Sequence, residues 1–136
     1  MTRVLIACTL ALILTSCASS SAPRVQRSEF EDVPVPAGLS LDASRTTIIE
    51  SPTVKAARLL YKSRLTPASL AVAYRTSLEA NGWRHVSSTT SADKGTTQVF
   101  EKPDSSMQVL IYEGWYYTWT EVSITRVVGR PSVPSR

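Results

Sequence analysis

Residues 66–83, TPASLAVAYRTSLEANGW, decide the fold, because they carry the one clear helix pattern of the sequence. Thr66 suits the N-cap, and Pro67 suits the first helical position, where its missing N–H costs nothing. Apolar residues then recur at spacings of three and four, on one face: Leu70, Ala71, Tyr74 and Leu78. The spacing predicts an amphipathic helix over residues 67–80.

The end of this helix is also encoded. Asn81-Gly82 follows Ala80, and glycine takes the left-handed conformation that a Cβ would oppose. Trp83 comes next and is expected to fold back onto the helix end.

Segments typical of strands flank the helix. Residues 46–50 and 54–64, separated by a Ser-Pro-Thr turn, predict a hairpin. After the helix, four strands with short connections are expected at residues 83–90, 96–102, 107–113 and 116–128. The sequence therefore predicts an α+β domain in the order ββαββββ, a twisted antiparallel sheet of about five to six strands with one helix on one face.

The chain of 136 residues divides into four parts. Residues 1–16 are expected to be a signal peptide and residues 17–32 a flexible polar tether. Residues 33–128 form the predicted domain, which a Val-Pro-Val-Pro lead-in opens, and residues 129–136 a disordered tail. A coil as long as this tether spans roughly 20 Å on average and about 50 Å when stretched.

The first part has the pattern of an export signal. Arg3 precedes an apolar run over residues 4–14, which spans roughly half of a ~30 Å hydrocarbon core and is too short for a stable transmembrane helix. Cys8 lies inside this run, so a processed chain keeps a single cysteine, which cannot form an internal disulfide.

Leu14-Thr15-Ser16-Cys17 resembles the lipobox of bacterial lipoproteins. The resemblance implies cleavage before Cys17 and its lipidation, and hence a membrane anchor. Ala18, in place of Asp, implies sorting to the outer membrane, with the domain facing the periplasm. The alternative is an ordinary signal cut elsewhere, which leaves Cys17 as a free thiol.

The sequence contains few candidates for catalytic, metal-binding or cofactor-binding residues. His85 is the single histidine, and with two cysteines in all it cannot complete a zinc finger or ribbon, so no metal and no cofactor are expected. The hydroxyls lie in no Gly-x-Ser-x-Gly or Ser-x-x-Lys motif, and no glycine-rich phosphate loop occurs. The eleven carboxylates are scattered, so an acid–base dyad stays open, but no catalytic residue is predicted and an enzyme is not expected.

The net charge is +4. Arg58, Lys62 and Arg64 alternate along the second predicted strand and suit anionic lipid, lipopolysaccharide or peptidoglycan. The alternative is a solvated strand face with cations that protect an edge. Nucleic acid is not an expected partner of an exported lipoprotein.

Aromatic residues gather near the last strand, where residues 114–119 read GWYYTW. Tyr117 and Trp119 alternate with the apolar residues of that strand and are expected on the sheet face without the helix. With Trp115 and Tyr112 they form a candidate binding patch for sugars, peptides or lipid headgroups. The alternative is that these rings pack under a loop or the proline-rich lead-in as a second small core.

A Tyr-x3-Leu-x3-Gly-Trp pattern (Tyr74, Leu78, Gly82, Trp83) resembles one found in small bacterial envelope lipoproteins, a group that implies no activity. The single helix on a sheet is also distantly similar to accessory lipoproteins of outer-membrane assembly machines, which bind partner proteins. We therefore expect a non-enzymatic, lipid-anchored envelope protein that binds another envelope component or serves as an assembly accessory. The alternative is a peptidoglycan- or carbohydrate-binding module that uses the aromatic patch.

Overall fold

The computed structural model describes Phe30 and residues 33–129. The predicted signal peptide, Cys17 with its lipidation, nearly all of the predicted tether and residues 130–136 of the predicted tail lie outside the described residues.

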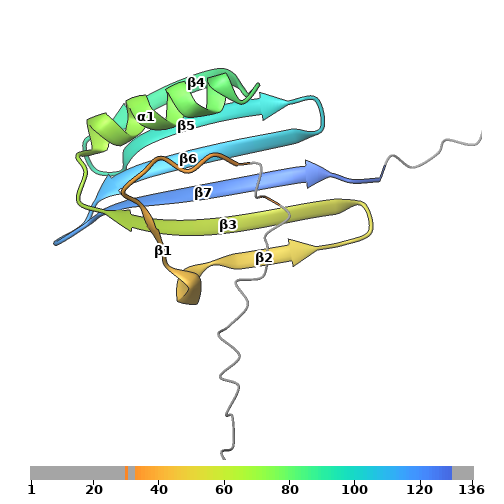
Figure 1. The fold of residues 1–136 in the computed structure, drawn as a ribbon, viewed down its shortest axis with the longest axis horizontal. Helices are drawn as coiled ribbons and strands as arrows, with labels where there is room; N and C mark the ends of the chain where they lie inside the picture. The colour runs from red at the N-terminus through yellow and green to blue at the C-terminus, as the bar shows by residue number, and fades with distance from the viewer. Residues whose placement is uncertain (1–29, 31–32, 130–136) are drawn as a thin grey trace, which may run out of the picture.

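The described chain forms an α+β domain with one α-helix and an open antiparallel sheet of seven strands (Figure 1). The predicted class is confirmed, and the predicted sheet of five to six strands was too small. The elements are β1 (Ser40–Leu41), the 3₁₀ turn η1 (Ala43–Arg45), β2 (Thr47–Glu50), β3 (Val54–Ser63), α1 (Pro67–Ala80), β4 (Arg84–Ser91), β5 (Gly95–Lys102), β6 (Ser105–Glu113) and β7 (Thr118–Val127).

The additional strand is β1, in a stretch between the lead-in and residue 46 for which no element was predicted. Its two residues, Ser40 and Leu41, pair with Lys62 and Tyr61 of β3. A pairing of two residues has no alternation that a sequence could show. β7 occupies one edge of β3 along its whole length, so β1 and β2 share the other edge.

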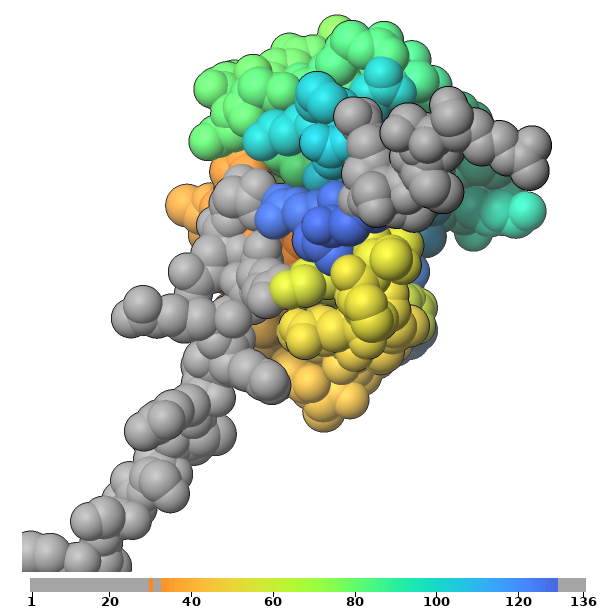
Figure 2. Space-filling model, turned by 90° about the vertical axis from the view of Figure 1, so that its right-hand side faces the viewer, coloured from red at the N-terminus to blue at the C-terminus, as the bar shows by residue number. Residues whose placement is uncertain are grey.

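The sheet has the order β1-β3-β7-β6-β5-β4, with β2 also on β3. β4 to β7 form a meander in which each strand pairs with the next, as the short connections predicted. Helix α1 carries the chain from β3 to the far edge at β4, and the meander returns until β7 lies beside β3. Figure 2 shows this order from one end, from green α1 through cyan and blue to the yellow β2–β3 hairpin.

Both ends of α1 are formed as predicted. The Thr66 side chain accepts a hydrogen bond from the backbone N–H of Ser69, at 3.3 Å. At the other end the N–H of Trp83 donates to the Leu78 carbonyl and that of Gly82 to the Glu79 carbonyl, which is a Schellman motif with Gly82 at φ +79°. Trp83 is buried against this end rather than opening the next strand, so β4 begins at Arg84.

The core lies on one face of the sheet. Leu70, Tyr74 and Leu78 of α1 are fully buried, and α1 contacts β4, β5 and β6. Phe30 and Val33 belong to the same buried cluster, so the orange segment in Figure 1 covers the part of this face that α1 leaves open. Phe30 falls within the predicted tether, yet its side chain is only 3% exposed and packs in the core.

Candidate functional site

The pairing of β3 with β7 brings two predicted clusters together. On β7, Thr118, Thr120, Val122 and Ile124 are buried on the helix side, and the residues between them are partly exposed, as the alternation predicted. Lys62 of β3 is the register partner of Trp119, and Trp119 is also that of Tyr112 on β6. Register partners project from the same face, so the basic stripe and the aromatic patch meet on the open face.

Cations lie over the rings of this face. The guanidinium of Arg45 is 4.8 Å from the ring centre of Trp119, and the ammonium of Lys62 is 5.6 Å from that of Tyr117. Arg64 lies 4.3 Å from the ring centre of Tyr116 and donates a hydrogen bond to its hydroxyl. Each geometry is within the range of a cation–π contact.

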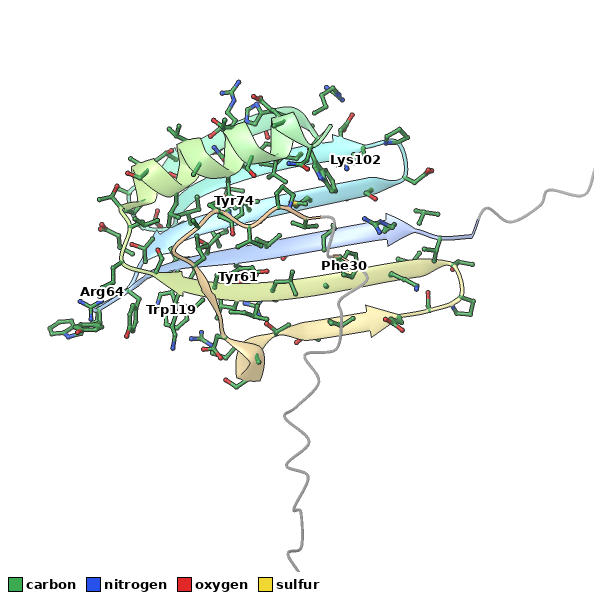
Figure 3. The ribbon with its side chains drawn as sticks, viewed as in Figure 1. Phe30, Tyr61, Arg64, Tyr74, Lys102 and Trp119 are labelled. Carbon is green, nitrogen blue, oxygen red and sulfur yellow. The ribbon has the colours of Figure 1, made fainter. Side chains whose placement is uncertain are left out.

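The rings also contact one another edge-on. Tyr116 and Tyr117 are 4.9 Å apart between centres, and Tyr117 and Trp119 are 6.3 Å apart. We call the whole set the cation–aromatic surface. Its members are Arg45, Lys62, Arg64, Tyr112, Trp115, Tyr116, Tyr117 and Trp119. Arg64 and Trp119 mark its place at one end of the sheet in Figure 3.

The β6–β7 turn forms the tip of this surface. The Gly114 N–H donates to the Tyr117 carbonyl at 2.8 Å, which closes a turn with Trp115 and Tyr116 at its centre. Trp115 is 103% exposed and Tyr116 61% exposed. Two aromatic residues are therefore presented to solvent at a hairpin tip.

All four residues of the predicted patch lie in this region. Tyr112, Tyr117 and Trp119 are partly exposed on the open face, and Trp115 is at the tip. The rings do not pack under the proline-rich lead-in, because Val33 belongs to the core on the opposite face. Arg45 of η1 does cover one side of Trp119.

Arg45 and Tyr116 were not among the predicted site residues. Arg45 reaches Trp119 from the turn between β1 and β2, a contact that no spacing within one strand indicates. Arg64 had been noted only as part of the basic stripe. Its link to Tyr116 depends on the β3–β7 pairing, between strands far apart in the sequence.

An ion pair adjoins the surface. Arg58 donates to a Glu121 carboxylate oxygen at 2.6 Å, and this hydrogen bond lowers the pKa of Glu121 against the opposing effect of partial burial. A hydrogen bond from Ser44 lowers the pKa of Asp42, with the charges of Arg45 and Lys62 acting in the same direction.

His85 lies away from this surface. Its ring makes an edge contact with Phe100, at 5.3 Å between centres, on the helix side of the sheet. Among Phe30 and residues 33–129, no three or more His, Cys, Asp or Glu side chains are grouped so that they could hold a metal ion.

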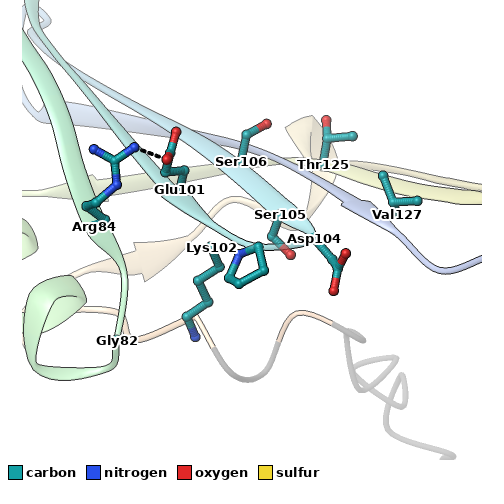
Figure 4. A pocket seen from close by; sticks show the side chains of 10 residues that line it. Gly82, Arg84, Glu101, Lys102, Asp104, Ser105, Ser106, Thr125 and Val127 are labelled. Carbon is teal, nitrogen blue, oxygen red and sulfur yellow. Dashed lines mark hydrogen bonds and ion pairs between the residues drawn. The ribbon is translucent and has the colours of Figure 1, made fainter. Parts of the chain in front are cut away.

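An open pocket of about 790 Å³ lies between the end of α1 and the β5–β6 turn (Figure 4). Arg84 and Glu101 form an ion pair in its wall, and the Lys102 ammonium lies 4.8 Å from the ring centre of Trp83. Lys102 and Trp119 lie towards different ends of the sheet in Figure 3, so this pocket is separate from the cation–aromatic surface.

Within the described ranges, no helix is both long enough and apolar enough to cross a membrane. The chain matches no protein-family model, and no curated protein or solved structure shows significant similarity to it.

Proposed function

We propose that this chain is a lipid-anchored protein of the cell envelope and that its α+β domain is a non-enzymatic binding module. In this proposal Cys17 carries the lipid in the outer membrane, and the domain faces the periplasm. The domain binds another envelope component or serves as an accessory of an assembly machine, and its binding surface is the cation–aromatic surface.

The observation that carries the proposal is the exposure of this surface. None of its rings belongs to the buried cluster formed by α1, the sheet and the lead-in, so the described core does not require them. Tyr, Trp and Arg are the residues that most often dominate binding energy at interfaces. Their concentration outside the core favours a role in recognition over a role in stability.

The alternative proposal is a peptidoglycan- or carbohydrate-binding module that uses the same rings. Sugars stack on open ring faces, and Trp115 offers one because its side chain is fully exposed. Tyr117 and Trp119 suit this role less, because Lys62 and Arg45 each lie over one of their ring faces. Cosedimentation with sacculi that is insensitive to substitution of Trp115, Tyr117 and Trp119 would remove this alternative.

The anchor is tested by labelling cells with radioactive palmitate. We expect label on the wild-type chain and none on Cys17→Ser. Persistent label on the variant would contradict the lipid anchor at this residue.

The binding surface is tested by in vivo crosslinking. A photoreactive amino acid is placed at position Tyr116, and at Val72 on the exposed side of α1 as the matched control. We expect adducts with an envelope component from position 116 alone. Equal adducts from both positions, or none from position 116, would contradict the proposal.

A further inference from the structure

We propose that the β6–β7 tip is a membrane-docking element, which places Trp115 in the interfacial layer of the membrane that holds Cys17. The inference rests on the lipid anchor of the proposed function and names what the exposed end of the cation–aromatic surface contacts. Its occupant is a phospholipid surface.

The first argument is the chemistry of the tip. Trp115 is fully exposed at the centre of a tight turn, so its large apolar ring gains nothing from the described fold. Indole and phenol rings, with an apolar body and a polar edge, concentrate at the boundary between hydrocarbon and water. Tyr116, the next residue of the turn, is also mostly exposed.

The second argument is the order of groups behind the tip. Arg64 lies over Tyr116 and Lys62 over Tyr117, and Arg45 lies over Trp119 further along β7. If Trp115 enters the bilayer, Tyr116 and Arg64 are the next groups to approach the headgroups, and Lys62 follows them. Cations at this depth are suited to headgroup phosphates, which attract basic side chains near the surface.

Acidic groups limit the electrostatic part of this attraction. Glu113 lines the hollow of about 510 Å³ at the tip together with Arg64, and Asp42 lies within electrostatic reach of Arg45 and Lys62. Glu121 is paired with Arg58. The charge of Glu121 also acts on Arg45, so all three carboxylates offset the cations of the surface, and docking depends more on Trp115 than on charge.

The third argument is the reach of the tether. The guanidinium of Arg126 lies over the ring of Phe30, 5.5 Å from the ring centre. The chain therefore enters the domain near the end of β7 that is remote from the tip. Eight residue steps of strand separate Arg126 from Thr118, which is about 27 Å. The thirteen steps from Cys17 to Phe30 reach up to about 45 Å. An anchor at Cys17 therefore allows the tip to contact the same membrane, and tethering makes even weak contact effective.

The test is quenching of tryptophan emission by brominated phospholipids. The full lipidated chain is reconstituted in vesicles of zwitterionic and anionic phospholipids with bromines near the headgroup end of the acyl chains. Trp83 is buried in the core and Trp119 is covered on one side by Arg45, so Trp115 is the tryptophan best placed for quenching. We expect quenching of the wild-type emission and the loss of most of that quenching in Trp115→Ser.

A matched control asks whether tethering alone brings any surface to the bilayer. Val72→Trp in the Trp115→Ser background places an exposed indole on α1. We expect no quenching from this position. Equal quenching of the indoles at positions 72 and 115 would overturn the inference, and so would wild-type emission that brominated lipid leaves unchanged.

Flotation of the same vesicles separates this inference from the proposed function. A chain that floats with the vesicles while Trp115 stays unquenched overturns the docking tip and leaves the lipid anchor in place. If position 115 then crosslinks to a protein in cells, the tip is a protein-binding element instead. A chain that does not float overturns the anchor and the docking tip together.

Discussion

Gly114 lies directly against the indole edge of Trp119. A Cβ added to Gly114 would be 2.6 Å from Nε1 and 2.7 Å from Cδ1 of that ring, closer than side chains pack. Arg45 lies over the same ring. The glycine that opens the β6–β7 turn therefore fixes the position of an aromatic ring on the open face of the sheet.

Gly114→Ala should displace Trp119 without unfolding the domain, because the ring lies outside the core cluster. We expect a large shift of the Trp119 indole N–H resonance and a loss of crosslinking from position 116. The buried Trp83 serves as the internal reference and should keep its resonance. An unchanged Trp119 resonance would show that the added methyl is accommodated elsewhere.

The open face shows how far the sequence could predict the site. Alternation along residues 54–64 and 116–128 assigned Arg58 and Lys62 to one face of their strand, and Tyr117 and Trp119 to one face of theirs. It could not show that the two faces coincide, because this depends on the β3–β7 pairing across some sixty residues. Local patterns determine strand faces, whereas long-range pairing determines which faces become neighbours.

The helix was predicted with its observed bounds, since its cap, apolar spacing and terminal glycine are all local signals. The features that were not predicted lie where the sequence carries no local signal. β1 is two residues long, and Phe30 is an isolated apolar residue in a polar stretch whose burial depends on a gap beside α1. The position of Arg45 depends on the turn that joins β1 to β2.

Gly82 and Gly95 provide a matched pair for backbone strain. Both have positive φ, but a Cβ on Gly82 would only touch the flexible side chain of Lys102, at 4.0 Å from Cε, whereas one on Gly95 would lie 2.1 Å from the Ile111 carbonyl oxygen. Gly82→Ala should cost about 1 kcal/mol of unfolding free energy, from the left-handed conformation alone. Gly95→Ala should cost at least about 2 kcal/mol more, because strand β6 must shift. Equal denaturation midpoints for the two variants would contradict this difference.

Tyr74 carries a buried hydroxyl with no hydrogen-bond partner among the residues that the structure describes. Tyr74→Phe removes this unpaired group and keeps the ring, so we expect about 1 kcal/mol of added stability in chemical denaturation. Thr120→Val, which removes another buried unpaired hydroxyl from β7, should act in the same direction. A clear loss of stability in both variants would contradict this account of the core.

Tyr74 also predicts a response to alkali. Burial raises the pKa of its hydroxyl above the ordinary value of 10.0, so the unfolded chain loses this proton at lower pH than the folded chain. The hydroxyl therefore leaves the free energy of unfolding independent of pH below pH 10 and lowers it as pH rises above that value. Tyr74→Phe should therefore widen its advantage over the wild type between pH 9 and pH 11, as measured by urea unfolding. An advantage that stays constant over this range would contradict the prediction.

The Arg58–Glu121 pair predicts the opposite dependence, in acid. The hydrogen bond from Arg58 lowers the pKa of Glu121 below its ordinary value of 4.5, so the stabilisation is present above that pH and is lost as pH falls below it. Glu121→Gln should be less stable than the wild type at pH 7. The two proteins should be equally stable at about pH 2, where the protonated Glu121 of the wild type is as neutral as the amide of the variant. Arg58→Met should show the same convergence. The effect is small because Arg58 is mostly exposed. A difference that persists unchanged into acid would contradict the role of this pair.

Strand β7 allows its two faces to be compared within one element. Ile124 is 1% exposed in the core, so Ile124→Ala should cost about 2–5 kcal/mol of unfolding free energy. Trp119 is partly exposed on the open face, so Trp119→Ala should cost less than that and leave the fold intact, although it removes a larger side chain. Chemical denaturation measures the first effect, and crosslinking from position 116 measures the second. Unfolding of Trp119→Ala would assign the ring to the stability of the domain, whereas a folded variant that has lost its crosslinks places Trp119 in recognition.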